Sequence, residues 1–246
     1  MASKGPDREH PTRIRPPAAG IPVDLPELQP IVHALAGGNP SQIRNAVADI
    51  DPILRAVYDL GEEAWQAGAA ADFLAATLYA SPRFYLRLHA HATGARDSDL
   101  HTHKGTVYST VLSGSLTNTS AKPSYTTQLR PSDGLDVWRC ACLADGSHTQ
   151  ERTGFTAVID PHTVVDEALH PGQGFIVRPG DYHRLEISRD SGTPTVTLCL
   201  FEWVDPDAPD AFVLTSRPTP VIADRDMTAA AARTAVRHLL DTGVAA

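Results

Sequence analysis

The pattern of hydrophobic and polar positions predicts helices at both ends of the chain. Between residues 24 and 80, apolar residues recur at helical spacing, most clearly in the run DPILRAVYDLGEEAWQAG. Within that run, Asp51 is expected to cap a helix whose first position is Pro52. We also expect a short helix from Ala71 to Leu78, and another from Thr228 to Leu240 near the C-terminus.

The middle of the chain has a different pattern. From residue 83 to 204, short runs rich in Val, Thr, Tyr and Phe are separated by Gly, Pro, Asp and Ser. Closely spaced strands between turn signals favour a sandwich or a closed barrel. The sequence therefore predicts a mainly β fold with an N-terminal helical cap and a C-terminal helix. Its expected parts are a disordered or extended arm (1–22), a helical segment packed on the barrel (23–81), the barrel (82–204) and a C-terminal extension with a helix (205–246).

Composition and charge narrow the function classes. The net charge of −8, with no long run of Lys or Arg, argues against a nucleic-acid or anionic-membrane partner. No apolar stretch reaches the roughly 18 residues of a membrane span, and the N-terminus has no apolar signal region. The three cysteines are Cys140, Cys142 and Cys199, an odd number that favours a reducing, cytoplasmic setting over a disulfide scaffold.

Three histidines form the strongest candidate site. His101 and His103 stand two positions apart, a spacing that places both side chains on one face of a strand. His183 lies 80 residues after His103, where a Pro-Gly turn leads into the strand HRLEI. The three side chains can converge only if a barrel closes between them, and we predict that they form a metal site.

The segments around these histidines resemble the two cupin motifs. GARDSDLHTHKGTVYSTVLSGSL is similar to the first motif, and GFIVRPGDYHRLEI is similar to the second. The resemblance implies a jelly-roll barrel in which His101, His103 and His183 hold a divalent metal. Many cupins add a glutamate four or five residues after the second histidine, where this chain has Val107 and Tyr108. A set of three neutral imidazoles suits Fe(II), although Zn, Ni or Mn could also bind.

Two longer segments resemble three-histidine thiol dioxygenases of the cysteine dioxygenase and plant cysteine oxidase type. They are LHTHKGTVYSTVLSGSL and HRLEISRDSGTPTVTLCLFEW. That family has a histidine and a catalytic tyrosine on its last strand, and these places fall on Cys199 and Phe201 here. The cysteine that some members crosslink to the tyrosine falls on Tyr108, and the upstream arginine that binds a carboxylate has no clear match. A phenylalanine cannot donate the hydrogen bond of the tyrosine, so the surroundings of the metal differ from the family's.

Other side chains could supply the missing groups. Tyr108, five residues after His103, is the candidate for a catalytic hydroxyl. Strand alternation in FYLRLHAHA places Tyr85, Arg87, His89 and His91 on one face. If that face points into the barrel, Tyr85, Arg87 and His89 could bind substrate, with Arg87 on an anionic group and His89 as acid or base. The alternative is that this face is solvated or covered by the N-terminal helices.

The leading hypothesis is a non-haem Fe(II) dioxygenase of thiol-dioxygenase type that acts on a small polar molecule and O2. Alternatives are a non-oxidative metal cupin (an isomerase, lyase or hydrolase that uses a Lewis-acid metal), a small-molecule-binding or sensory cupin without turnover, and a metal-free structural cupin. The sequence does not identify the substrate. A homodimer is possible because an exposed sheet face can pair with a second copy.

Overall fold

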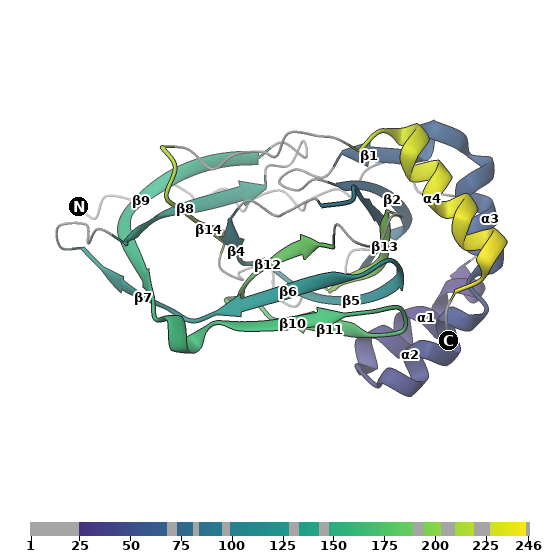
Figure 1. Ribbon diagram of the computed structural model, residues 1–246, viewed down its shortest axis with the longest axis horizontal. Helices are drawn as coiled ribbons and strands as arrows, with labels where there is room; N and C mark the ends of the chain where they lie inside the picture. Colours follow the sequence, from purple (N-terminus) through teal and green to yellow (C-terminus); the bar gives the residue numbers. More distant parts are fainter. Residues whose placement is uncertain are drawn as a thin grey trace, which may run out of the picture.

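The computed structural model describes residues 25–67, 73–80, 84–94, 99–127, 133–142, 148–188, 194–202, 210–218 and 227–244 (Figure 1). The arm predicted at residues 1–22 lies outside this part. The helices are α1 (Leu25–Gly37), α2 (Pro40–Ala48), α3 (Asp51–Asp59), the short 3₁₀ helix η1 (Gly61–Ala64) and α4 (Ala229–Thr242). They gather at one end of the molecule, on the right in Figure 1. Within the described residues, no helix combines the length and apolarity of a membrane span.

Local signals explain where the helices begin. The side chain of Asn39 accepts hydrogen bonds from the first amides of α2, and Thr228 does the same for α4. In α3, by contrast, Asp51 is the first helical residue rather than the expected cap, and Ile50 holds the cap position without a side-chain bond. Pro52 is therefore the second helical residue rather than the first, still within the first turn, where its missing N–H needs no partner.

The strands form two antiparallel sheets. The first sheet has the order β1 (Trp65–Ala67), β2 (Phe73–Ala80), β3 (Phe84–His91), β13 (Thr195–Glu202), β5 (Thr106–Ser113) and β11 (Gly174–Val177). The second has the order β10 (Val165–Leu169), β6 (Leu116–Ala121), β12 (Tyr182–Ile187), β4 (Leu100–His101), β14 (Ala211–Thr215), β8 (Leu135–Cys142), β9 (His148–Ile159) and β7 (Pro123–Thr126). A second 3₁₀ helix, η2 (Pro161–Thr163), separates β9 from β10.

The chain alternates between the sheets in the manner of a jelly roll. Strands β4, β6, β10 and β12 belong to the second sheet, while β3, β5, β11 and β13 belong to the first. Apolar side chains from both sheets meet in one buried cluster, which comprises Val107, Val111, Leu116, Leu169, Phe175, Val177 and Ile187. The structure therefore confirms the predicted mainly β jelly roll with helices in the N-terminal region and at the C-terminal end.

The helices cover the outer face of the first sheet. Leu86 and Leu88 of β3 and Leu198 and Leu200 of β13 are fully buried in a cluster that they share with α1, α3 and α4. The residues between them along each strand point to the opposite face, into the barrel. The helical layer thus fixes which side of β3 and β13 faces the interior.

One element expected from the sequence is wrong. The helix expected from Ala71 to Leu78 is, from Phe73 on, strand β2, which pairs with β3 from Phe73↔His91 to Ala80↔Tyr85. Alanine favours helices, but most of β2 is buried, so its run FLAATLYA lacks the alternation that marks a strand with a solvated face. The segment 205–246, expected as a C-terminal extension with a helix, carries α4 and also contributes strand β14 to the second sheet.

The second sheet closes on itself. A single residue, Lys122, separates β6 from β7, and β7 pairs with β9, so the strands β6/β7, β12, β4, β14, β8 and β9 make a closed ring. In Figure 1, β9 bends at the left side of the molecule to meet β7. The ring encloses its own apolar cluster, which comprises Leu100, Ala121, Val137, Ala157, Tyr182 and Leu214. Strands β4 and β12 are therefore packed on both faces, one toward the jelly-roll interior and one toward this cluster.

Candidate metal centre

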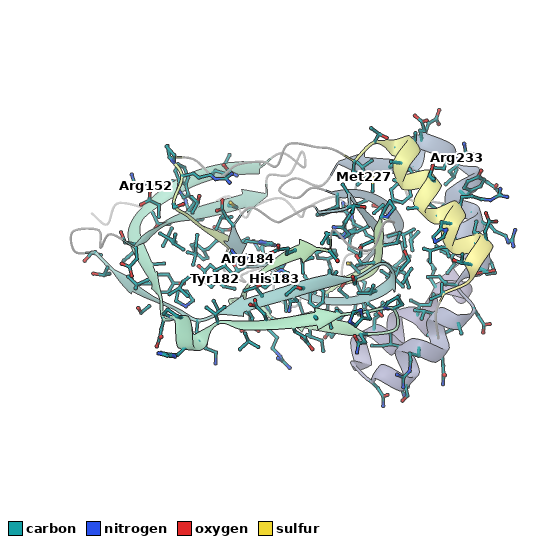
Figure 2. All side chains as sticks on the ribbon, in the orientation of Figure 1. Arg152, Tyr182, His183, Arg184, Met227 and Arg233 are labelled. Carbon is teal, nitrogen blue, oxygen red and sulfur yellow. The ribbon has the colours of Figure 1, made fainter. Side chains whose placement is uncertain are left out.

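The structure brings the three predicted histidines together. His101 ends β4, His103 follows in the adjoining loop, and His183 on β12 pairs directly with His101. Figure 2 shows His183 near the middle of the molecule, close to Tyr182 and Arg184. One ring nitrogen of each histidine lies within 4.8 Å of the others, and the Nε2 atoms of His103 and His183 are 2.9 Å apart. We call these three residues the histidine cluster.

Hydrogen bonds orient two of the three rings. The Nδ1–H of His183 donates to Oδ1 of Asn118 over 3.0 Å, and the Nδ1–H of His101 donates to the backbone oxygen of Asp99 over 3.2 Å. Because both partners are oxygen acceptors, the proton resides on Nδ1 and Nε2 carries a free lone pair. No sequence motif marks Asn118, whose only signal is its position two residues after Leu116 on the same face of β6.

The environment keeps two of the three rings, those of His103 and His183, uncharged. Burial, together with the neighbouring His101, lowers the pKa of His103 to about 3. Burial, together with His101 and His103, also lowers the pKa of His183, which is 4% exposed. At neutral pH both imidazoles are therefore neutral, which is the form that binds a metal ion.

The residues fit a divalent transition metal. The Nδ1 bond to Asn118 leaves Nε2 of His183 without a proton, and this lone pair faces His103. Within the part of the chain that the structure describes, the cluster is the one group of three potential ligands close enough to share an ion, and it contains no carboxylate. Three imidazole ligands with no carboxylate suit Fe(II), Zn, Ni or Mn rather than Ca²⁺ or Mg²⁺.

The polar face of β3 points into the barrel. Tyr85, Arg87 and His89 pair with residues of β13 whose side chains share the interior face, with Tyr85 opposite Phe201. The ring of Phe201 lies 5.9 Å from that of His103 and 6.0 Å from that of His89, between centroids. This face is therefore not covered by the helices, and it forms the wall of the barrel beside the histidine cluster, with His89 buried and Tyr85 and Arg87 partly exposed.

Contacts within this wall hold its side chains in place. The guanidinium of Arg87 lies over the ring of Tyr85 and donates to its hydroxyl over 2.6 Å. His89 stacks on Phe73 with 4.3 Å between ring centroids, and Nε2 of His91 lies 3.3 Å from Oγ1 of Thr197. Burial and the nearby His91 and Arg87 lower the pKa of His89, so this ring is also neutral at neutral pH.

Several buried polar atoms around the cluster have no hydrogen-bond partner among the residues that the structure describes. In the first sheet they are Nε of Arg87 and Nε2 of His89, and in the second Oδ2 of Asp99 and Nε1 of Trp138. Buried polar atoms are nearly always paired in folded proteins, so each such atom marks a position where a bound molecule could supply the partner. All four of these atoms belong to residues on the faces that carry or adjoin the histidines.

The structure does not place Tyr108 at the cluster. Its neighbours Val107 and Ser109 face the interior, so Tyr108 points to the helical side of β5, where its hydroxyl donates to Oε2 of Glu202 over 3.2 Å. The prediction counted positions from His103, but residues 102–105 lie outside the strands and break the alternation. On the interior face of β5, the hydroxyl is that of Ser109, which lies 3.2 Å from the buried sulfur of Cys199.

A cleft approaches the cluster between the edges of the two sheets. It runs between β10 and β11, has a volume of about 650 Å³, and is lined by both His183 and Asn118. Exposed charged residues, among them Glu167 and Arg178, also line it. A molecule of moderate size could therefore approach the ring of His183 from the surface.

Comparisons with known proteins add only distant likenesses. No model of a protein family matches the chain, and no curated protein matches it. Solved structures that match include an RmlC-like cupin from Shewanella frigidimarina (15% identity, TM-score 0.32, 58% of this chain and 84% of that chain). Others are the polyketide cyclase RemF from Streptomyces resistomycificus (15%, 0.35, 63% and 78%) and a variant of oxalate decarboxylase from Bacillus subtilis (12%, 0.33, 56% and 26%). Matches at these identities and scores carry no inference about activity.

Proposed function

We propose that the protein is a metal-dependent enzyme, a non-haem Fe(II) dioxygenase of thiol-dioxygenase type that acts on a small polar molecule. The observation that carries this proposal is the convergence of three histidine side chains, His101, His103 and His183, on the interior face of a jelly roll. Ferrous iron held by these residues would supply the chemistry that adds both atoms of O2 to a thiol sulfur, giving a sulfinic acid.

Arg87 provides the anchor for an anionic group of the substrate. Its guanidinium lies on the interior wall, and its buried Nε has no partner among the described residues. Tyr85 holds the other end of the guanidinium through the 2.6 Å hydrogen bond. A carboxylate that accepts from Nε would complete the hydrogen bonding of a positive charge that is otherwise only partly satisfied.

His89 provides the proton carrier. The places of the family's histidine and tyrosine hold Cys199, whose thiol is buried beside Ser109, and Phe201, which has no hydroxyl. His89 packs against Phe201 from the neighbouring strand and is 5% exposed, with Nε2 unpartnered in the described part of the chain. A neutral imidazole at this place can accept the proton of an incoming thiol and return it later.

The test begins with protein purified without oxygen. We expect bound iron by elemental analysis, and O2 consumption with at least one of cysteine, cysteamine and 3-mercaptopropionate. His183→Ala should lose the metal, whereas His162→Ala, at an exposed histidine on η2, should keep it. Zinc alone, with no O2 consumption by the Fe(II)-loaded protein across the thiols, would exclude the dioxygenase. Metal retained by His183→Ala at the wild-type level would exclude the site itself.

A further inference from the structure

The face that carries the histidines continues across the closed ring. His183 pairs with His101, His101 pairs with Val213 of β14, and Val213 pairs with Trp138 of β8. Residues that pair directly across antiparallel strands project to the same side of the sheet. Trp138 therefore stands on the same face as His101, two strands further along.

The indole of Trp138 is available to a ligand. Its Nε1 is buried and has no hydrogen-bond partner among the residues that the structure describes. A buried indole N–H normally has a partner, because leaving it unpaired costs free energy. Trp65 also has an unpartnered indole N–H, but it lies in the apolar cluster between the first sheet and the helices, away from the histidines.

Neighbouring groups do not compete for a ligand at this place. Val213, which lies between His101 and Trp138, is apolar and partly buried. Asp136, two residues before Trp138 on the same face, accepts a hydrogen bond from Arg152 over 2.5 Å, so these two charges satisfy each other. Among the described residues of this row, the buried donor without a partner is the indole N–H of Trp138.

We infer that Trp138 is a specificity-determining residue that donates a hydrogen bond to a carbonyl or carboxylate of an extended thiol substrate. This inference rests on the proposed function, in which the thiol lies at the histidine cluster. Neighbouring strands are about 4.8 Å apart, so β8 lies about 10 Å from β4. In free cysteine two carbons separate the sulfur from the carboxylate carbon, which is too short to span this distance. A cysteinyl dipeptide or glutathione is long enough.

The experiment compares short and long thiols on Co(II)-loaded protein. Thiol binding is followed by the sulfur-to-cobalt absorption band, and O2 consumption is measured separately on the Fe(II)-loaded protein. Trp138→Phe keeps the aromatic ring but removes the N–H. We expect it to weaken binding of cysteinylglycine and glutathione about tenfold while leaving cysteamine binding unchanged. Trp65→Phe is the matched control, since it removes the other unpartnered indole N–H, and it should bind every thiol like the wild type.

The outcomes separate this inference from the proposed function. Equal affinity of the wild type and Trp138→Phe for both long thiols would overturn the role of Trp138, whatever the protein does with O2. Failure of the wild type to bind either long thiol would overturn it too. If Trp138→Phe selectively weakens long-thiol binding but no thiol supports O2 consumption, the role of Trp138 stands and the dioxygenase fails.

Discussion

Asn118→Ala tests whether the hydrogen bond behind His183 prepares the ring to bind a metal. Asn118 is 7% exposed and His183 is 4% exposed, so the 3.0 Å bond between them lies mostly away from bulk water. The bond keeps the proton on Nδ1. Without it, the proton can move to Nε2, where the Nε2 of His103 lies 2.9 Å away as an acceptor. The metal-free protein can thus adjust to the substitution, whereas the metal-bound protein needs Nε2 free.

The expected loss therefore falls on metal affinity. Removing a group that orients a metal-bound histidine typically costs ten- to a hundredfold in affinity, or about 1.4 to 2.8 kcal/mol. If the Nδ1–H stays unpaired, the metal-free protein loses about 1 to 3 kcal/mol of stability as well. Asn118→Asp keeps an oxygen acceptor at the same position, so its metal affinity should equal or exceed that of the wild type.

Metal affinity can be measured by competition with a chromophoric chelator, using Co(II) and Zn(II). Urea unfolding of the metal-free variants shows how much of any loss comes from the fold. Wild-type affinity in Asn118→Ala would refute the reasoning, because it would mean that the proton position on His183 does not limit binding. An equal loss in Asn118→Ala and Asn118→Asp would also refute it, since the acceptor oxygen would then be irrelevant.

Two further predictions concern His91 and Tyr108. Burial lowers the pKa of His91 from 6.5 to about 4, so the unfolded chain binds this proton at higher pH than the folded chain, and stability falls as the pH drops from 6.5 to about 4. His91 alone contributes about 3 kcal/mol to this fall in the free energy of unfolding. Urea unfolding at a series of pH values should therefore show a flatter dependence of stability on pH for His91→Gln than for the wild type. Parallel curves for the two proteins would contradict the lowered pKa of His91. Tyr108→Phe, which removes the bond to Glu202, should cost about 1 kcal/mol in thermal unfolding and leave metal binding and O2 consumption unchanged. Loss of metal in this variant would place Tyr108 at the cluster after all.

The strand pattern predicted a sandwich or a closed barrel, and the resemblance of the segments around the histidines to the cupin motifs implied the jelly roll. A His-x-His pair and a third histidine 80 residues later can meet only if the barrel closes between them, so their spacing predicted the convergence. Strand alternation in FYLRLHAHA also placed Tyr85, Arg87 and His89 on one face correctly. Which side of the sheet that face takes depends on the helices that cover Leu86 and Leu88, and these contacts are tertiary.

The failures have physical causes. Strand β2 was taken for a helix because a strand buried on both faces loses its period of two, which leaves only the helical preference of its alanines. Tyr108 was assigned to the site because alternation was carried through a loop that does not preserve it. Asn118 and Trp138 belong to no motif, and their relation to the histidines arises only from the pairing of β6 with β12 and of β8 with β14.

The closed ring has a consequence for the order in which the protein folds. Strand β4 is two residues long, and His101 pairs with His183 and Val213, which follow it by more than 80 and more than 110 positions. Contacts between such distant positions form slowly, because a long stretch of chain must first be brought together. During synthesis β4 has neither neighbour until β12 and then β14 have emerged. The histidine cluster is therefore assembled late, and metal capture should follow folding of the barrel rather than initiate it.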